Sequence, residues 1–90
     1  MWSRDHVTND ITKRLTVTNT FPEARTFVLE PWANEHRMEP GERFVVEAKG
    51  PPDGPDLELI EEDGGYIVVW AWPGSIARVL RETGEIVEDW

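Results

Sequence analysis

Short runs of alternating apolar and polar residues follow one another along the chain. In the first run, Leu15 and Val17 alternate with Arg14, Thr16 and Thr18. A period of two is typical of a strand that buries one face. Such runs recur about every 8–12 residues with turn residues between them, which is typical of a sandwich or barrel. The pattern therefore predicts an all-β fold, a small antiparallel β-sandwich or partly open barrel of about seven or eight short strands.

Each predicted strand is a run of alternating or continuously apolar residues between turn signals. The predicted strands cover residues 11–19, 26–30, 35–38, 43–48, 57–62, 66–72, 75–81 and 85–87. One segment also fits a helix, because Ile76, Val79 and Leu80 have the spacing i, i+3, i+4. That segment is about seven residues long and lies between two glycine turns, so a strand is the better interpretation.

Proline and glycine mark the connections. Pro31 ends the second predicted strand or places it at a sheet edge. Pro40 and Gly41 fit the middle of a type II turn, in which proline presets φ and glycine supplies a positive φ. Residues 50–56 contain three prolines and two glycines and are interpreted as an ordered crossing loop. Residues 63–65 read as a hairpin turn.

The length of 90 residues corresponds to one domain. We expect a single β-sandwich domain over residues 11–90, preceded by an N-terminal segment over residues 1–10. That segment is polar and lacks the apolar stretch of a secretory signal. The longest apolar run, residues 66–72, is far shorter than the roughly 20 residues that span a bilayer. These features predict a cytoplasmic protein without a membrane segment.

The charge is strongly acidic and unevenly distributed. Eighteen acidic and nine basic residues give a net charge of −9; residues 1–45 carry −1 and residues 46–90 carry −8. Binding to nucleic acid or to an anionic membrane needs clustered lysine and arginine, so neither is expected. The acidic surface favours solubility or a basic partner.

The sequence offers little for catalysis or for a cofactor. There is no cysteine, which excludes disulfides, cysteine-ligated zinc and iron–sulfur clusters. A blue-copper site needs a cysteine beside ligands such as His6, His36 and Met38, so it is excluded as well. Ser3 and Ser75 lie in no nucleophile motif, and no phosphate-binding loop occurs. We therefore expect no enzyme activity, no cofactor and no metal.

An acidic cluster is the next candidate. Its members are Asp56, Glu58, Glu61, Glu62 and Asp63. Their spacing matches no calcium-binding loop. We interpret the cluster as solvated charge that protects a strand edge from aggregation, with a weak calcium site as the alternative.

Tryptophan is the most informative residue, with five copies in the chain. On the strand predicted over residues 66–72, alternation places Tyr66, Val68, Trp70 and Trp72 on one face and aliphatic residues on the other. Because both faces are apolar, the outward one needs a cover: a loop, a neighbouring chain or a ligand. We expect Trp70 to be a core residue that stabilises the fold. The alternative is an aromatic binding or association face made of Trp32, Tyr66, Trp70 and Trp72.

Three segments carry a family resemblance. They are Leu29-Glu30-Pro31-Trp32, the run from Met38 through Pro40-Gly41-Glu42 to Val46, and Val69-Trp70-Ala71-Trp72-Pro73-Gly74. Together they resemble small uncharacterised bacterial all-β proteins in which a Pro-Gly-Glu turn precedes a late aromatic strand. The turn is also similar to strand connections in cupredoxin-like and immunoglobulin-like sandwiches. The resemblance implies an architecture and no activity.

These observations favour a non-enzymatic, acidic interaction module that binds a protein partner or itself. The alternative is a carbohydrate-binding module that stacks sugars on Trp32, Trp70 or Trp72. Exposure of these side chains is the observation that separates a core role from either binding role.

Overall fold

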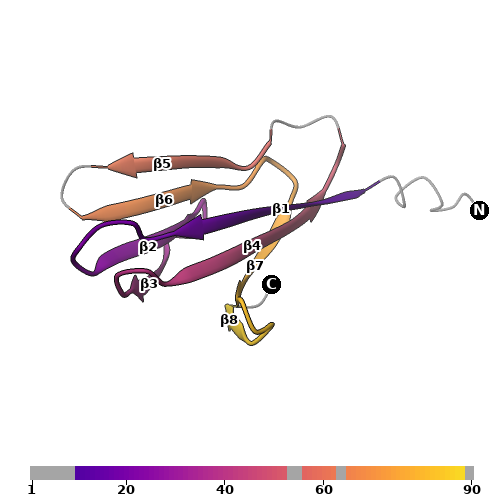
Figure 1. Ribbon diagram of the computed structural model, residues 1–90. Coiled ribbons are helices and arrows are strands. Elements are labelled where there is room, and N and C mark those ends of the chain that lie inside the picture. Colours follow the sequence, from indigo (N-terminus) through magenta and orange to yellow (C-terminus); the bar gives the residue numbers. More distant parts are fainter. Residues whose placement is uncertain (1–9, 53–55, 63–64, 89–90) are drawn as a thin grey trace, which may run out of the picture.

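The computed structural model describes residues 10–52, 56–62 and 65–88. All regular structure in these ranges is β-strand, and the strands form two four-stranded sheets (Figure 1). Their bounds are β1 Ile11–Thr18, β2 Arg25–Glu30, β3 Asn34–Met38, β4 Arg43–Gly50, β5 Glu58–Glu62, β6 Tyr66–Trp70, β7 Ile76–Arg81 and β8 Ile86–Glu88. The predicted all-β sandwich is confirmed, as an open pair of sheets and not as a closed barrel. The N-terminal segment predicted over residues 1–10 lies, apart from Asp10, outside the described residues.

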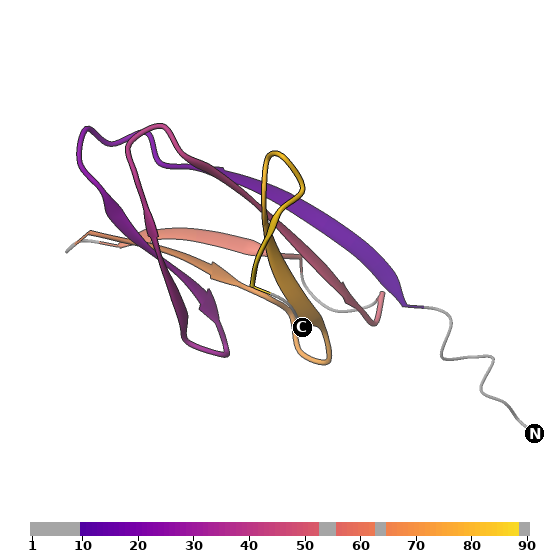
Figure 2. The same cartoon turned by 90° about the horizontal axis from the view of Figure 1, so that it is seen from below.

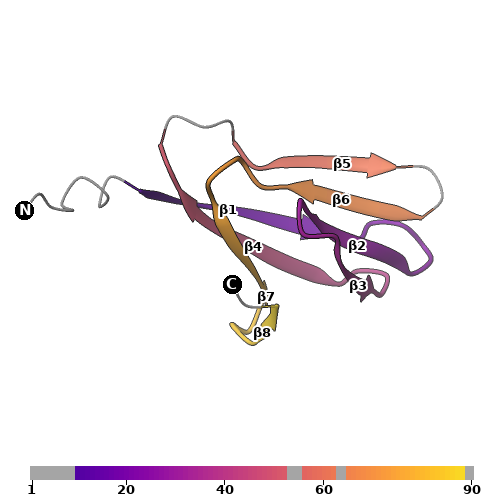
Figure 3. The ribbon, with the colours of Figure 1, turned by 180° about the vertical axis from the view of Figure 1, so that it is seen from behind.

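The two sheets form separate layers (Figure 2). The first sheet has the order β1-β4-β7-β8 and the second has the order β3-β2-β6-β5. Seen from behind, β5 and β3 form opposite edges of the second sheet with β6 and β2 between them (Figure 3). The chain passes from one sheet to the other after β1, β3, β4 and β6, so both layers are built from the whole length of the chain.

One strand pair departs from the predicted antiparallel arrangement. β2 and β6 are parallel, whereas every other described pair is antiparallel. No hairpin joins β2 to β6, because the chain leaves the second sheet after β3 and returns through β5. Strands joined by a tight turn pair in an antiparallel arrangement. No such turn joins β2 and β6, so the reason for expecting an antiparallel pair does not apply to them.

The turns follow their predicted chemistry. Gly41 has a φ of 81°, and the Glu42 N–H donates to the Glu39 carbonyl at 3.0 Å, as a type II turn requires. β2 ends at Glu30, so Pro31 terminates the strand. β2 has β3 on one side and β6 on the other, so it is not an edge strand. Residues 63 and 64 of the predicted hairpin turn lie outside the described residues.

The core lies between the sheets and is made of the inward-facing positions of both. Its members are Val17, Phe27, Leu29, Met38, Phe44, Val46, Ala48, Ile67, Val69, Ala71, Trp72, Ala77 and Val79. Phe27 and Phe44 meet edge to face across the layers, with ring centroids 5.4 Å apart, a favoured aromatic geometry. His36, half-buried, lies beside both rings.

Trp72 belongs to this core and not to the face of Trp70. β6 ends at Trp70, two residues earlier than predicted, and the alternation of β6 stops there. The chain then turns toward the first sheet, which leaves Trp72 only 2% exposed. Its Nε1 donates to the Pro51 carbonyl at 2.8 Å. The prediction that Trp72 shares a face with Trp70 is therefore wrong, because the strand ended between them.

Gly50 shows how closely the crossing segments pack. A Cβ on Gly50 would lie 2.6 Å from the Cα of Ser75. Ser75 itself closes the turn after β6, where its N–H and its Oγ both donate to the Trp72 carbonyl, at 3.0 and 2.6 Å. Trp72 and Gly50 together hold the start of the crossing loop, at Pro51, against the connection from β6 to β7. Residues 53–55 of the predicted crossing loop lie outside the described residues.

Asn19 connects two other loops and is fully buried. Its Nδ2 donates to the carbonyls of Glu23 and Met38, at 3.0 and 3.1 Å. Its Oδ1 accepts from the Phe21 N–H at 3.0 Å. Because buried polar atoms need partners, this side chain joins the β1–β2 loop to the end of β3.

Candidate functional site

The four aromatic residues predicted as a candidate face occupy three different environments. Tyr66 and Trp70 lie on the solvent side of the second sheet, and each is 41% exposed. Trp32 is 39% exposed in the connection between β2 and β3. Trp72 is buried in the core. The expectation that Trp70 is a core residue is thus wrong, and it holds for Trp72 instead.

The strand register brings other residues beside Tyr66 and Trp70. Glu30 of β2 and Glu58 of β5 are the direct cross-strand neighbours of Trp70. In the next outward-facing row, Val28 and Ile60 flank Val68, and Glu35 of β3 is opposite Val28. We call this outward surface of β3, β2, β6 and β5 the aromatic face.

A groove of about 250 Å³ lies on the aromatic face. It is lined by Val28, Glu30, Ala33, Glu35, Tyr66, Val68 and Trp70. Val28 and Val68 are only 7% and 5% exposed although they point away from the core. Tyr66 and Trp70 stand two positions before and after Val68, so the two rings flank an apolar floor.

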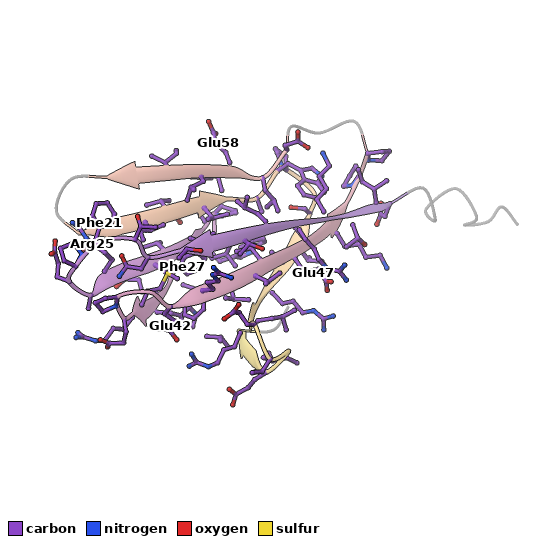
Figure 4. All side chains as sticks on the ribbon, in the orientation of Figure 1. Phe21, Arg25, Phe27, Glu42, Glu47 and Glu58 are labelled. Atoms are coloured by element: carbon purple, nitrogen blue, oxygen red, sulfur yellow. The ribbon has the colours of Figure 1, made fainter. Side chains whose placement is uncertain are left out.

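Three carboxylates around this groove have no counter-charge. Within the described ranges, Glu30, Glu35 and Glu58 form no ion pair, and Glu58 projects outward from β5 (Figure 4). Most other described carboxylates are paired with lysine or arginine: Glu23, Glu39, Glu42, Glu47, Asp56, Glu82 and Glu85. The aromatic face therefore combines exposed rings with uncompensated negative charge.

Sequence reasoning missed the contribution of Glu30 and Glu35. It treated Glu58 only as a member of the acidic cluster. The residues are far apart in the chain, and the parallel pairing of β2 with β6 brings them together. No local pattern specifies that pairing, so the sequence contained no signal for the row Glu30–Trp70–Glu58.

Only Asp56 and Glu58 of the predicted acidic cluster have side chains that the structure describes. Asp56 pairs with Lys13 across the connection to β5. Asp63 and the side chains of Glu61 and Glu62 lie outside what the structure describes. Among the described side chains, no group of three histidine, aspartate or glutamate residues could hold a metal ion.

Met38 and Ser75, two further residues considered in the sequence analysis, are buried in the fold. Met38 is fully buried and Ser75 is 8% exposed, with its hydroxyl bonded to a backbone carbonyl. His6 and Ser3 lie outside the described residues. Among the residues that the structure describes, no helix is long and apolar enough to cross a membrane.

A second groove, near Gly65 and His36, is lined by Glu35 and by two arginines, Arg25 and Arg37. Both are already engaged: Arg25 pairs with Glu23 and lies 3.8 Å from the Phe21 ring centroid, and Arg37 pairs with Glu39. Phe21 and Arg25 lie side by side at one end of the sandwich (Figure 4). This groove therefore offers less uncompensated charge than the aromatic face.

Glu47 is buried on the outer side of the first sheet and pairs with two arginines. Arg78 of β7 and Arg14 of β1 are its cross-strand neighbours. Their side chains bind its carboxylate at 2.7 and 2.6 Å. Hydrogen bonds from Arg78 and then Arg14 hold the pKa of Glu47 below its ordinary value of 4.5. This row links β1, β4 and β7 and has a structural role.

Comparisons of the chain with protein-family models, with curated proteins and with solved structures found no match.

Proposed function

We propose that the protein is a non-enzymatic module that binds a protein partner through the aromatic face. The observation that carries this proposal is the groove between two exposed rings, Tyr66 and Trp70, with Val28 and Val68 as its floor. Tyrosine and tryptophan are enriched at the centres of protein interfaces, where they supply large rigid contact surfaces. Adjacent carboxylates would form the polar rim.

Pairing of two copies through this face is less well supported. It would bring the uncompensated charges of Glu30, Glu35 and Glu58 toward their equivalents in a second copy, and like charges in contact are costly. The net charge of −9 adds to that repulsion. A different protein is therefore the better occupant.

Carbohydrate binding is the second candidate. An exposed indole can stack on a sugar, and the carboxylates of Glu30 and Glu58 beside Trp70 can accept hydrogen bonds from hydroxyl groups. The apolar floor of Val28 and Val68 favours a side chain of a peptide over a hydroxyl-rich ligand.

A catalytic role has less support. Among the described residues, Ser75 is buried with its hydroxyl bonded to a carbonyl and does not line the groove, and no serine, threonine or histidine lines it. The lack of cysteine agrees with a cytoplasmic location, which stays a prediction.

A displayed random peptide library and a glycan array test the proposal. Peptides selected on the wild-type protein should bind a Tyr66→Ala/Trp70→Ala variant at least about tenfold more weakly. A matched control is Ile76→Ala/Ile86→Ala, which removes two other exposed apolar side chains, 47% and 49% exposed, from the first sheet. The control should bind the same peptides with unchanged affinity.

Three outcomes would overturn the proposal. Equal binding by both double variants would show that the aromatic face is not the site. Glycan binding without peptide binding would establish the second candidate. Sedimentation equilibrium that shows a wild-type dimer lost in Tyr66→Ala/Trp70→Ala would assign the face to self-association.

A further inference from the structure

We infer that the partner segment is basic and that one of its arginine or lysine side chains lies on the Trp70 indole between Glu30 and Glu58. This inference deepens the proposed function and rests on it. It names the chemistry of the partner, which the apolar groove alone leaves open.

The row Glu30–Trp70–Glu58 supplies the geometry. The three residues are direct neighbours on three adjacent strands and point to the same side of the sheet. Neighbouring strands lie about 4.8 Å apart, so a carboxylate stem stands at that spacing on each side of the indole. A cation within about 6 Å of the centre of an indole is attracted by the ring. The same cation would be within reach of both carboxylates.

Charge complementarity indicates that the ligand carries a positive charge. Elsewhere on the described surface, glutamates form ion pairs with arginines, as Glu82 pairs with Arg43 and Glu42 and Glu85 pair with Arg81. Around the groove no described cation pairs with Glu30, Glu35 or Glu58. A cationic partner would supply the missing counter-charges.

The groove also fits the shape of a basic side chain. Arginine and lysine carry an apolar stem below a charged head. Val28 and Val68 would contact the stem while the head remains on the Trp70 ring near Glu30. Arginine suits the site better, because its planar guanidinium stacks on an aromatic ring and binds carboxylates with two hydrogen bonds.

The length of the groove suggests the spacing of basic residues in the partner. Tyr66 and Trp70 are four residues apart on one strand, which is about 13 Å at the rise of a β-strand. In an extended segment, side chains four positions apart on one face span the same distance. A partner with arginine at positions i and i+4 would thus place one side chain at each ring.

Three synthetic peptides of equal length test this inference. The first carries arginine at positions i and i+4 among threonine and glycine, the second carries citrulline at both positions, and the third carries glutamate. Titration calorimetry should detect binding of the arginine peptide only. Raising the salt concentration from about 0.05 to 0.5 M should weaken that binding, because exposed charges are screened.

A charge-matched pair of variants locates the effect. Glu30→Gln/Glu58→Gln should weaken binding of the arginine peptide by about tenfold or more. Glu82→Gln/Glu85→Gln removes the same charge from the connection between β7 and β8 and should change the affinity less than about twofold. Equal losses in both variants would show unspecific attraction to an acidic protein and would overturn the inference.

The results separate this inference from the proposed function. If selected peptides need Tyr66 and Trp70 but are not basic, or if citrulline binds as well as arginine, the inference is wrong and the proposed function stands. If no peptide, basic or neutral, depends on Tyr66 and Trp70, both are wrong. Melting curves confirm that each variant is folded in every comparison.

Discussion

Trp70 and Trp72 are two positions apart, and the fold places them in opposite environments. Trp72 fills the core and donates a hydrogen bond to the Pro51 carbonyl, whereas Trp70 stands on the aromatic face. The difference arises because β6 ends at Trp70, so the alternation of the strand does not continue to Trp72.

This contrast gives the first prediction. Trp72→Ala should destabilise the protein by about 3–5 kcal/mol, as expected for a buried aromatic side chain. Trp70→Ala should cost about 1 kcal/mol or less, because a large part of the ring is already in water. Thermal unfolding followed by circular dichroism measures both. A Trp70→Ala variant as unstable as Trp72→Ala would contradict the placement of Trp70 at the surface.

Asn19 gives a second prediction at the scale of one residue. Asn19→Ala removes three hydrogen bonds of a buried side chain and leaves the Glu23 and Met38 carbonyls without these donors, so it should cost about 1–3 kcal/mol. Urea denaturation measures the loss. Thr20→Ala, at the exposed neighbouring position, is the control and should change the stability by less than about 0.5 kcal/mol. Equal effects of the two substitutions would remove the assigned role of Asn19.

At the scale of the element, a row of charges links β1, β4 and β7 across the outer side of the first sheet. Glu47 occupies the middle of the row with an arginine on each side. Both arginines lower its pKa below 4.5 in the folded protein, while the unfolded chain has the ordinary value. The carboxylate therefore stabilises the fold fully above about pH 4.5, and this contribution is lost as the pH falls through the lower, folded-state pKa.

The third prediction follows from the lowered pKa of Glu47 in the folded protein. At pH 7, Glu47→Gln should reduce the free energy of unfolding by about 1–3 kcal/mol. The difference between wild type and Glu47→Gln should shrink as the pH falls below 4.5. Denaturation curves from pH 7 to about pH 3 measure it. Glu82→Gln, which removes an exposed carboxylate paired with Arg43, should have a small effect at every pH. A difference for Glu47→Gln that persists or grows in acid would refute the role of the ionised carboxylate.

At the scale of the whole molecule, the two sheets share one core and exchange strands repeatedly. The chain changes sheet after β1, β3, β4 and β6, so neither sheet is a continuous segment. Separation of the sheets would expose the inner faces of both, including Phe27 and Phe44.

We therefore predict a single cooperative unfolding transition. Far-ultraviolet circular dichroism, which reports the strands, and tryptophan fluorescence should give the same midpoint, as is usual for single domains of this size. Repeating the fluorescence measurement on Trp70→Phe makes the signal depend less on the aromatic face and should leave the midpoint close to that of the dichroism curve. Two separate midpoints would mean that the sheets unfold independently.

The sequence by itself determined the local elements of this protein. Each strand has its residues within about two positions of the predicted range, because alternation and turn chemistry act over a few neighbouring residues. Pro40 and Gly41 specify their turn through their own backbone preferences. Ile76–Arg81 is a strand, as its short length between glycine turns predicted.

Only the tertiary structure decided which strands are neighbours and which apolar face meets water. β2 and β6 pair in parallel although three strands separate them in sequence, and that pairing alone places Glu30 beside Trp70. The crossing from β6 to β7 buries Trp72 and leaves Trp70 outside. Both outcomes depend on contacts between segments that are distant in the sequence. Backbone hydrogen bonds between strands form in the same way whatever the sequence separation of the strands. An alternating strand with two apolar faces can bury either face, so its own sequence does not decide which face meets water.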